Sequence, residues 1–247
     1  MAGVRVGTSG WSYDHWDGPF YPDTVKAADR LRFYATRFPT VEIDATFYRL
    51  PTENAVRGWR DAVPKGFAFA VKGSRYITHF RRLRDAADAV DAFTDRLSLL
   101  GDALHVVLWQ LQPTMRCDTA ALDAFLTLAG TKVRHAVEFR HESWLVPQTF
   151  KVLRAHGAAQ VHVSSDEMPA DLTPTADFVY VRFHDTSSYH GGYLEPALAP
   201  WAAFLREQAA AGRDGYAYFN NDAGAHAPAD ATRLIAMLGD TAVPQPA

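Results

Sequence analysis

Acidic, basic and imidazole side chains stand at the ends of several short apolar segments of this 247-residue chain. Asp44 and Glu138 end two of these segments, and a carboxyl group can act as a general acid or base. Lys72 and His184 end two others, and a desolvated lysine can act as an electrophile or, less often, form a Schiff base. We predict that these four residues are catalytic, with Glu138 as the general acid or base and Asp44 as a second carboxylate.

Cations outnumber these two carboxylates. An uncompensated charge that is taken out of water is costly, so an excess of buried cations requires a negative partner. Arginine matches phosphate or carboxylate oxygens with two parallel hydrogen bonds. We therefore predict a site for an anionic ligand, formed by Lys72, Arg75, Arg140 and Arg182.

Aromatic and amide groups accompany these charges. Trp11 and Tyr13 begin a run with five aromatic residues, 11–21, directly after the first apolar segment. Such rings stack on sugar or base rings, although they also serve as ordinary apolar cover. We predict that Trp11 and Tyr13 contact the ligand and that Tyr180 and Asn220 orient it through hydrogen bonds.

A purely structural interpretation of the charges stays open. Glu138 can pair with Arg182, and Asp44 with Lys72, which would give a buried lattice of ion pairs without any turnover. In the first interpretation a bound anion neutralises the cations, whereas in the second the carboxylates of the protein do so.

The elements that must position these residues are eight predicted strands separated by stretches of helical length that end at glycine. This alternation predicts an α/β fold, a TIM-like (β/α)8 barrel. A short or missing helix is expected after strand six, because only residues 166–177, with two prolines, precede strand seven. We expect one domain over residues 1–243 and a loose tail over 244–247. The predicted strands are residues 4–9, 41–47, 67–73, 105–111, 136–140, 160–165, 178–184 and 215–220.

Period-two alternation predicts which strand residues face the interior. In the seventh strand, Val179 and Val181 should face helices, which places Tyr180 and Arg182 inside. Active sites of such barrels lie at the carboxyl ends of the strands, so the inward side chains should meet at one mouth. The expected interior is unusually polar and includes Arg5, Ser9, Glu42, Asp44, Lys72, Gln110, Glu138, Arg140, His162, Ser164, Arg182, His184, Tyr218 and Asn220.

Five motifs stand out: GTSGWSY at 7–13, VEIDATFYRLP at 41–51, VKGSRYITH at 71–79, EFRHESW at 138–144 and YFNND at 218–222. Together they resemble the YecE-like family, domain of unknown function number 72. The resemblance implies a TIM-barrel-like fold, loosely similar to sugar isomerase and endonuclease IV type barrels, and supplies no catalytic residues. The chain departs from the family pattern at Gln112, where proline is usual, and at Asp185, where glycine is usual. The second departure concerns the loop that contains Tyr189 and Tyr193.

Composition limits the partners. The net charge of -3 does not favour binding of a polyanion such as nucleic acid by the protein as a whole. No uncharged segment is long enough to span a membrane. Cys117 is the one cysteine, which fits a reducing cytoplasm. We expect no cofactor and no metal, because strict ligand spacing is absent even though acids and histidines could converge. That conceivable metal set is His79, His141, His184, Glu138 and Asp222.

The leading hypothesis is an enzyme that acts on a phosphorylated or otherwise anionic sugar-like small molecule by acid–base chemistry, as an isomerase, lyase or hydrolase. One alternative is a nucleic-acid-binding barrel, because residues 71–84 hold five cations and two aromatic residues without an acid. The other alternative is a metabolite-binding protein without catalysis.

Overall fold

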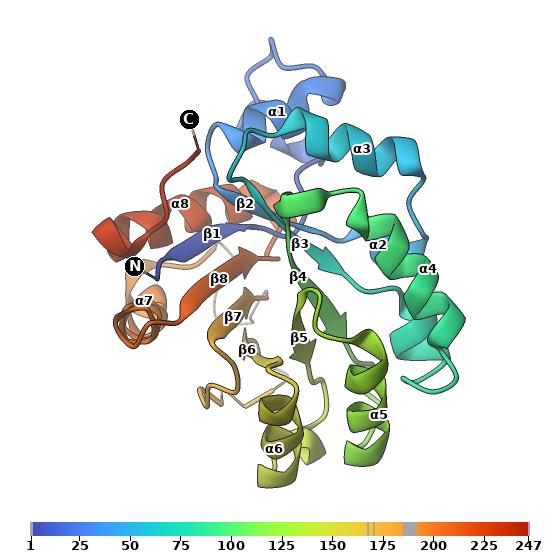
Figure 1. Ribbon diagram of the computed structural model, residues 1–247. Helices are drawn as coiled ribbons and strands as arrows, with labels where there is room; N and C mark the ends of the chain where they lie inside the picture. Colours follow the sequence, from blue (N-terminus) through green and yellow to red (C-terminus); the bar gives the residue numbers. More distant parts are fainter. Residues whose placement is uncertain (1, 167, 170, 185–191, 247) are drawn as a thin grey trace.

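The computed structural model describes residues 2–166, 168–169, 171–184 and 192–246. Eight parallel strands form a nearly closed barrel at its centre, in the order β1-β8-β7-β6-β5-β4-β3-β2 (Figure 1). The predicted TIM-like fold is therefore confirmed. The strands are β1 (Val4–Thr8), β2 (Thr40–Ile43), β3 (Ala68–Lys72), β4 (Leu104–Gln110), β5 (Arg134–Glu138), β6 (Ala159–Ser164), β7 (Phe178–Phe183) and β8 (Asp214–Phe219).

The strands are not joined equally. β7 pairs with β8 at six positions, whereas β5 and β6 pair only through Ala136 with Ala159 and Val137 with Gln160. β1 and β2 meet in an isolated bridge between Ser9 and Glu42. The barrel thus has two seams with few backbone hydrogen bonds.

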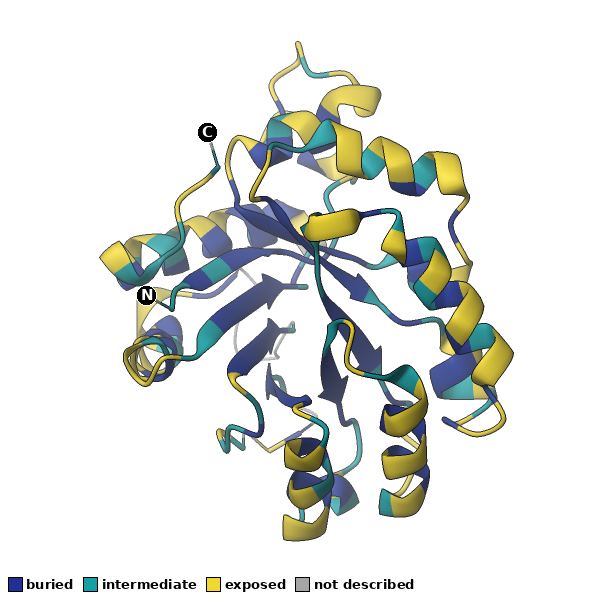
Figure 2. Cartoon of the chain, in the orientation of Figure 1, coloured by how far each residue is buried: buried dark blue, intermediate teal, exposed yellow. Residues whose placement is uncertain are grey.

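Helices surround the barrel, with their buried faces toward the strands and their exposed faces outward (Figure 2). Val179 and Val181 of β7 belong to the core packed between strands and helices, as the alternation predicts. Asp118 accepts a hydrogen bond from the Ala121 amide at the start of α5, and Gly130, with φ of 72°, ends that helix. The helices are α1 (Arg30–Ala35), α2 (Ala45–Tyr48), α3 (Glu53–Ala62), α4 (Ala87–Ser98), α5 (Thr119–Ala129), α6 (Pro147–Ala155), α7 (Glu195–Ala210) and α8 (His226–Leu238).

Strand two is shorter than predicted. β2 ends at Ile43, and the turn of α2 follows at once. The Thr46 hydroxyl donates to the Lys72 carbonyl at 2.7 Å and lies 3.0 Å from the Ile43 carbonyl, which fixes this turn against β3. Asp44 still stands at the strand end, as expected from the sequence.

No helix lies between β6 and β7 in the described part of residues 166–177, as predicted. The two faces of β6 are reversed, however, and the inward assignment of His162 and Ser164 is wrong. Val161 and Val163 pack in the barrel interior. His162 Nδ1 lies 2.7 Å from the Asp171 carbonyl and its ring contacts Phe204 of α7. A loop rather than a helix covers much of this strand, so its outer face can be polar.

The carboxyl-terminal residues return to the amino-terminal part of the barrel. The Val243 amide donates to the Val4 carbonyl at 2.8 Å. Within the predicted tail, Gln245 donates to the Arg37 carbonyl at 2.6 Å. Among the described helices, none combines the length and the apolar character needed to cross a membrane.

Candidate functional site

A fully buried triad of charges fills the barrel interior near the carboxyl ends of the strands. The guanidinium of Arg182 donates to Glu42 Oε1 and to Glu138 Oε2, each at 2.7 Å. All three side chains have 0% exposure. Each of the two carboxylates therefore faces Arg182 rather than solvent.

Further hydrogen bonds complete the triad. Ser9 and Tyr180 donate to Glu42 at 2.7 and 2.5 Å, and Gln110 donates to Glu138 at 2.8 Å. Burial by itself raises the pKa of Glu138, but Arg182 and its other partners lower it well below the usual value. The pKa of Glu42 is also lowered, by Arg182 against the effect of burial. Both carboxylates are thus held in the ionised form.

The predicted charge count needs correction because it omitted Glu42. Three carboxylates, not two, face the cations, since Asp44 joins Glu42 and Glu138. The charge of Arg182 is balanced by two protein carboxylates, as in the structural interpretation of the charges, although its Nε has no hydrogen-bond partner among the described residues. The case for an anionic ligand therefore depends on the cations nearer the surface.

A second layer of polar groups lies above the triad and is partly exposed. Arg140 is 17% exposed and donates to Glu138 Oε1 at 3.0 Å. His184 Nε2 lies 3.5 Å from the same oxygen, while Asn220 Nδ2 lies 3.2 Å from His184 Nδ1. His184 Nε2 also lies 3.4 Å from Arg140 Nη1 and from Arg182 Nη1, so this ring nitrogen faces two guanidinium donors as well as the Glu138 carboxylate. Burial lowers the pKa of His184, which favours the neutral ring.

Asp44 differs from the other carboxylates. Its side chain is 22% exposed, and Oδ1 lies 3.7 Å from Lys72 Nζ and 3.9 Å from Arg182 Nη2. Within the described residues this oxygen has no hydrogen-bond partner. Burial and the neighbouring Glu42 raise the pKa of Asp44 to about 6. Asp44 is thus a carboxyl group that titrates near neutral pH at the mouth of the barrel.

An aromatic pocket of about 310 Å³ adjoins Asp44. Its aromatic walls are Trp11 and Tyr13 after β1, Tyr48 in α2 and Trp59 in α3. Tyr13 donates to the Ser9 carbonyl at 2.8 Å, and burial together with Asp44 raises its pKa. The pocket and the charged layer therefore share Asp44 as a common boundary.

Arg75 lies on the rim. Its guanidinium is 5.4 Å from the ring centre of Tyr48 and 5.8 Å from that of Phe80. It makes no ion pair with any described carboxylate. Arg75 adds positive charge outside the buried network.

Most of the predicted site residues come together. Asp44, Lys72, Glu138, Arg140, Arg182 and His184 belong to one network with Tyr180 and Asn220, whereas Trp11 and Tyr13 line the adjoining pocket. The loop residues Asp185 and Tyr189 lie outside the described residues. Tyr193 is described, and its hydroxyl donates to the His184 carbonyl at 2.7 Å.

Sequence reasoning missed part of the site. Glu42 was placed inside, but it was not counted near the mouth because it precedes the strand end. Tyr48 and Trp59 lie on helices, to which the strand alternation does not apply. Tyr48 belongs to the family-like motif 41–51, and this membership is the sequence signal that could have pointed to it.

Of the five residues considered for a metal, Glu138 and His184 lie 3.5 Å apart, and the other three have separate partners. His79 packs on Phe47, His141 accepts from the Ser143 amide, and Asp222 accepts from Trp16 Nε1. Across the described ranges, no group of three or more His, Cys, Asp or Glu side chains could hold an ion. That a metal is not required stays a prediction.

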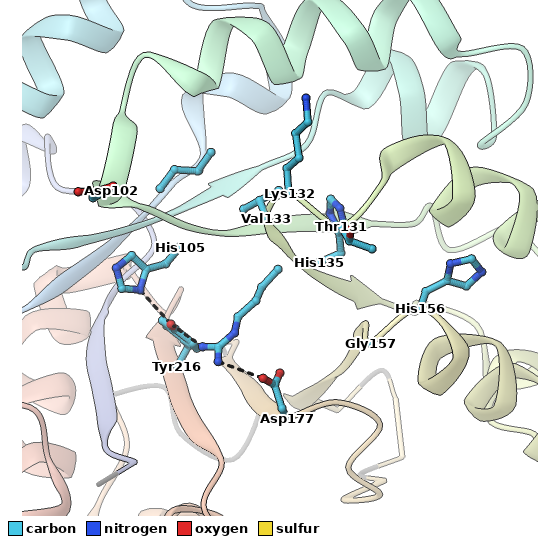
Figure 3. A pocket seen from close by; sticks show the side chains of 12 residues that line it. Asp102, His105, Thr131, Lys132, Val133, His135, His156, Gly157, Asp177 and Tyr216 are labelled. Carbon is cyan, nitrogen blue, oxygen red and sulfur yellow. Dashed lines mark hydrogen bonds and ion pairs between the residues drawn. The ribbon is translucent and has the colours of Figure 1, made fainter.

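A larger cavity, of about 600 Å³, lies at the opposite, amino end of the barrel (Figure 3). Arg134 reaches Asp214 at 2.8 Å and Asp177 at 3.3 Å there. Burial and the nearby arginines lower the pKa of His105 to about 4, and its Nδ1 lies 3.0 Å from the Tyr216 hydroxyl.

The fold and the polar interior at the carboxyl ends define a TIM-barrel-like α/β protein. The pattern of the family described as "Protein of unknown function DUF72" matches residues 5–247, and the chain belongs to this family. It is 27% identical to the UPF0759 protein YunF of Bacillus subtilis (strain 168), over 95% of this chain and 94% of that protein.

Solved structures agree with this assignment. A DUF72 family protein from Thermotoga maritima is 27% identical, with a TM-score of 0.86 over 95% of this chain and 98% of that one. A xylose isomerase-like TIM barrel protein from Mycobacterium smegmatis is 11% identical, with a TM-score of 0.54 over 87% of this chain and 89% of that one. The second similarity concerns the fold alone.

Proposed function

We propose that the protein is an enzyme that acts on a phosphorylated or otherwise anionic sugar-like small molecule by acid–base chemistry at the carboxyl-end mouth. Asp44 carries this proposal. Its carboxyl group is partly exposed, lies 3.7 Å from Lys72 and has a pKa raised to about 6. A group that titrates near neutral pH can both give and take a proton.

The roles differ from those expected from the sequence. Glu138 is fully buried and its pKa is lowered, so it suits positioning of Arg140 and His184 better than proton transfer. We assign the general acid or base to Asp44. Isomerisation, lyase cleavage and hydrolysis all use such a group.

Lys72 and Arg140 are the proposed contacts to the anion. Their side chains are 13% and 17% exposed, whereas Arg182 has 0% exposure and acts by holding Glu42 and Glu138. Desolvated cations of this kind bind phosphate or carboxylate strongly.

Inorganic phosphate is a direct probe of this site. We expect it to bind near pH 7 and to raise the pKa of Asp44 as measured by carbon NMR, because a second negative charge disfavours the carboxylate. Lys72→Met should weaken phosphate binding about tenfold, since it removes a charge-assisted hydrogen bond. Lys132→Met is the matched control, because Lys132 lies exposed at the amino-end cavity. Absent binding, or equal losses in the two variants, would contradict the proposal.

One observation favours nucleic-acid binding as a second candidate. Tyr76 and Phe80 are 51% and 68% exposed, and Arg75 lies against Phe80. Exposed rings beside a cation suit stacked bases and phosphates. Such binding should fall steeply with salt concentration, unlike binding in a closed pocket. A metabolite-binding protein would bind the anion without turning it over.

A further inference from the structure

We infer that the aromatic pocket beside Asp44 holds a planar heteroaromatic ring, so that the ligand of this mouth is a ring-bearing anion with the chemistry of a mononucleotide. The anionic half of this inference rests on the proposed function. The ring half rests on the pocket itself.

The aromatic walls come from separate parts of the chain. Trp11 and Tyr13 follow β1, Tyr48 belongs to α2, and Trp59 comes from α3. Trp11 and Trp59 meet edge to face, with ring centres 6.0 Å apart. A pocket of about 310 Å³ is at the small end of the range for ligand sites and suits one ring system.

The pocket is held open by contacts that do not involve a ligand. The buried Trp16 donates to Asp222 at 2.6 Å, which ties the loop after β1 to the loop after β8. Tyr21 donates to the Trp11 carbonyl. Gly10 has φ of 85°, and a Cβ there would lie 2.4 Å from the Tyr13 hydroxyl, so Tyr13 packs directly over this glycine. A wall fixed in this way loses little freedom when a ring binds.

Tyr48 is the open wall. Its side chain is 65% exposed, although one surface lines the pocket and Arg75 lies 5.4 Å from its ring centre. A large exposed ring at the edge of a pocket is suited to stacking on a ligand, and the nearby guanidinium adds positive charge beside it.

The lining favours a flat ring over a sugar. Each buried sugar hydroxyl needs a hydrogen-bond partner, or its desolvation goes uncompensated. The Tyr13 hydroxyl already donates to a carbonyl, and Ser12 is exposed, which leaves the partly exposed Asp44 as the main polar side chain of the lining. A planar ring stacks on aromatic faces without such partners, and Asp44 can bond to one ring nitrogen or amine.

The aromatic pocket and the charged layer of the mouth then bind different parts of the ligand. The ring occupies the aromatic pocket, and the phosphate lies toward Lys72 and Arg140 on the other side of Asp44. A sugar between them would sit beside the Asp44 carboxyl group. This arrangement agrees with the sugar-like anion of the proposed function and adds the ring.

Calorimetric titration separates these parts. The probes are uridine and adenosine, their 5′-monophosphates, and ribose 5-phosphate, each with the full chain near pH 7. At least one nucleotide should bind about tenfold more tightly than ribose 5-phosphate, the difference expected from stacking of one base. Tyr48→Ala should remove this advantage and leave the affinity for ribose 5-phosphate unchanged. Tyr76→Ala is the control, because Tyr76 is an exposed ring outside the pocket.

The possible results distinguish the ring inference from the proposed anion site. If nucleotides bind no more tightly than ribose 5-phosphate, the ring inference is wrong while the anion site stands. If Tyr48→Ala weakens ribose 5-phosphate instead, the pocket holds the sugar, and the inference is again wrong. If nucleosides bind through Tyr48 but ribose 5-phosphate does not bind, the ring inference holds and the proposed anion site fails. If no probe binds, both are overturned.

Discussion

Each end of the barrel has a cavity with charged residues, but the two ends differ in how those residues are paired. At the amino end lies the cavity of about 600 Å³ (Figure 3), and its arginine, Arg134, is paired with Asp214 and Asp177. At the carboxyl end, the pocket is about half that size, and Asp44 beside it keeps an oxygen without a hydrogen bond in the described structure. A carboxyl group whose pKa is raised to about 6 beside a pocket is a candidate functional residue, which the volume of a cavity alone does not provide.

The largest expected effect concerns the triad. Arg182→Met would leave Glu42 and Glu138 buried without their cation, which should lower the free energy of unfolding by about 3–5 kcal/mol or prevent folding. Urea unfolding near pH 7 measures the loss. Replacing both glutamates by glutamine in the same chain should recover part of it, because no uncompensated charge then remains. A loss below about 1 kcal/mol for Arg182→Met would mean that the triad is not a structural unit.

A smaller effect of opposite sign is expected at Asp44. The pKa of Asp44 is raised from 3.8 to about 6, so the folded state binds this proton more tightly than the unfolded state does. The resulting contribution to the free energy of unfolding is fully present below pH 3.8 and is lost as the pH rises through about 6. Asp44→Asn should therefore increase the free energy of unfolding by about 1–2 kcal/mol near pH 8 and change it little near pH 4.

Thermal unfolding over this pH range tests the expectation for Asp44. Asp23→Asn is the control, since Asp23 is exposed. A variant that is less stable than the parent at pH 8 would show that Asp44 mainly stabilises the fold through Lys72. In that case the contrast between the two ends would lose its basis.

The smallest effect is expected at the amino end. The Arg134 side chain is 33% exposed, and its ion pairs reach Asp214 and Asp177, which are also partly or largely exposed. Arg134→Met should cost about 1 kcal/mol of stability because exposed pairs contribute little. Phosphate binding, measured by calorimetry, should stay unchanged. A loss of phosphate binding comparable to that in Lys72→Met would move the anion site to the amino end.

The fold and most of the charged network could be predicted from the sequence because two simple rules describe a (β/α)8 barrel. Strands alternate with helices along the chain, and strand ends meet at one mouth. These rules alone bring Glu138, Arg140, Arg182 and His184 together, and the four residues do share one network. The short, proline-containing connection after β6 also predicted that no regular helix would follow, and its described residues contain none.

The rest depended on contacts that neither rule describes. The alternation assumes that a helix covers every strand, and it failed at His162 because Asp171 of a loop supplies a polar partner there. Trp59 comes from α3 and reaches the mouth only through the packing of that helix. The pairing of Glu42 with Arg182 required the geometry of strands far apart in the chain.

Arg182 also acts as a crosslink between two half-barrels. The backbone divides at its two weak seams into β2–β5 and a second set of β6, β7, β8 and β1. Arg182 belongs to the second set, and both of its partners belong to the first: Glu42 on the strand beside one seam and Glu138 on the strand beside the other. One guanidinium that no solvent reaches thus holds together, through side chains, two halves that the backbone joins only loosely.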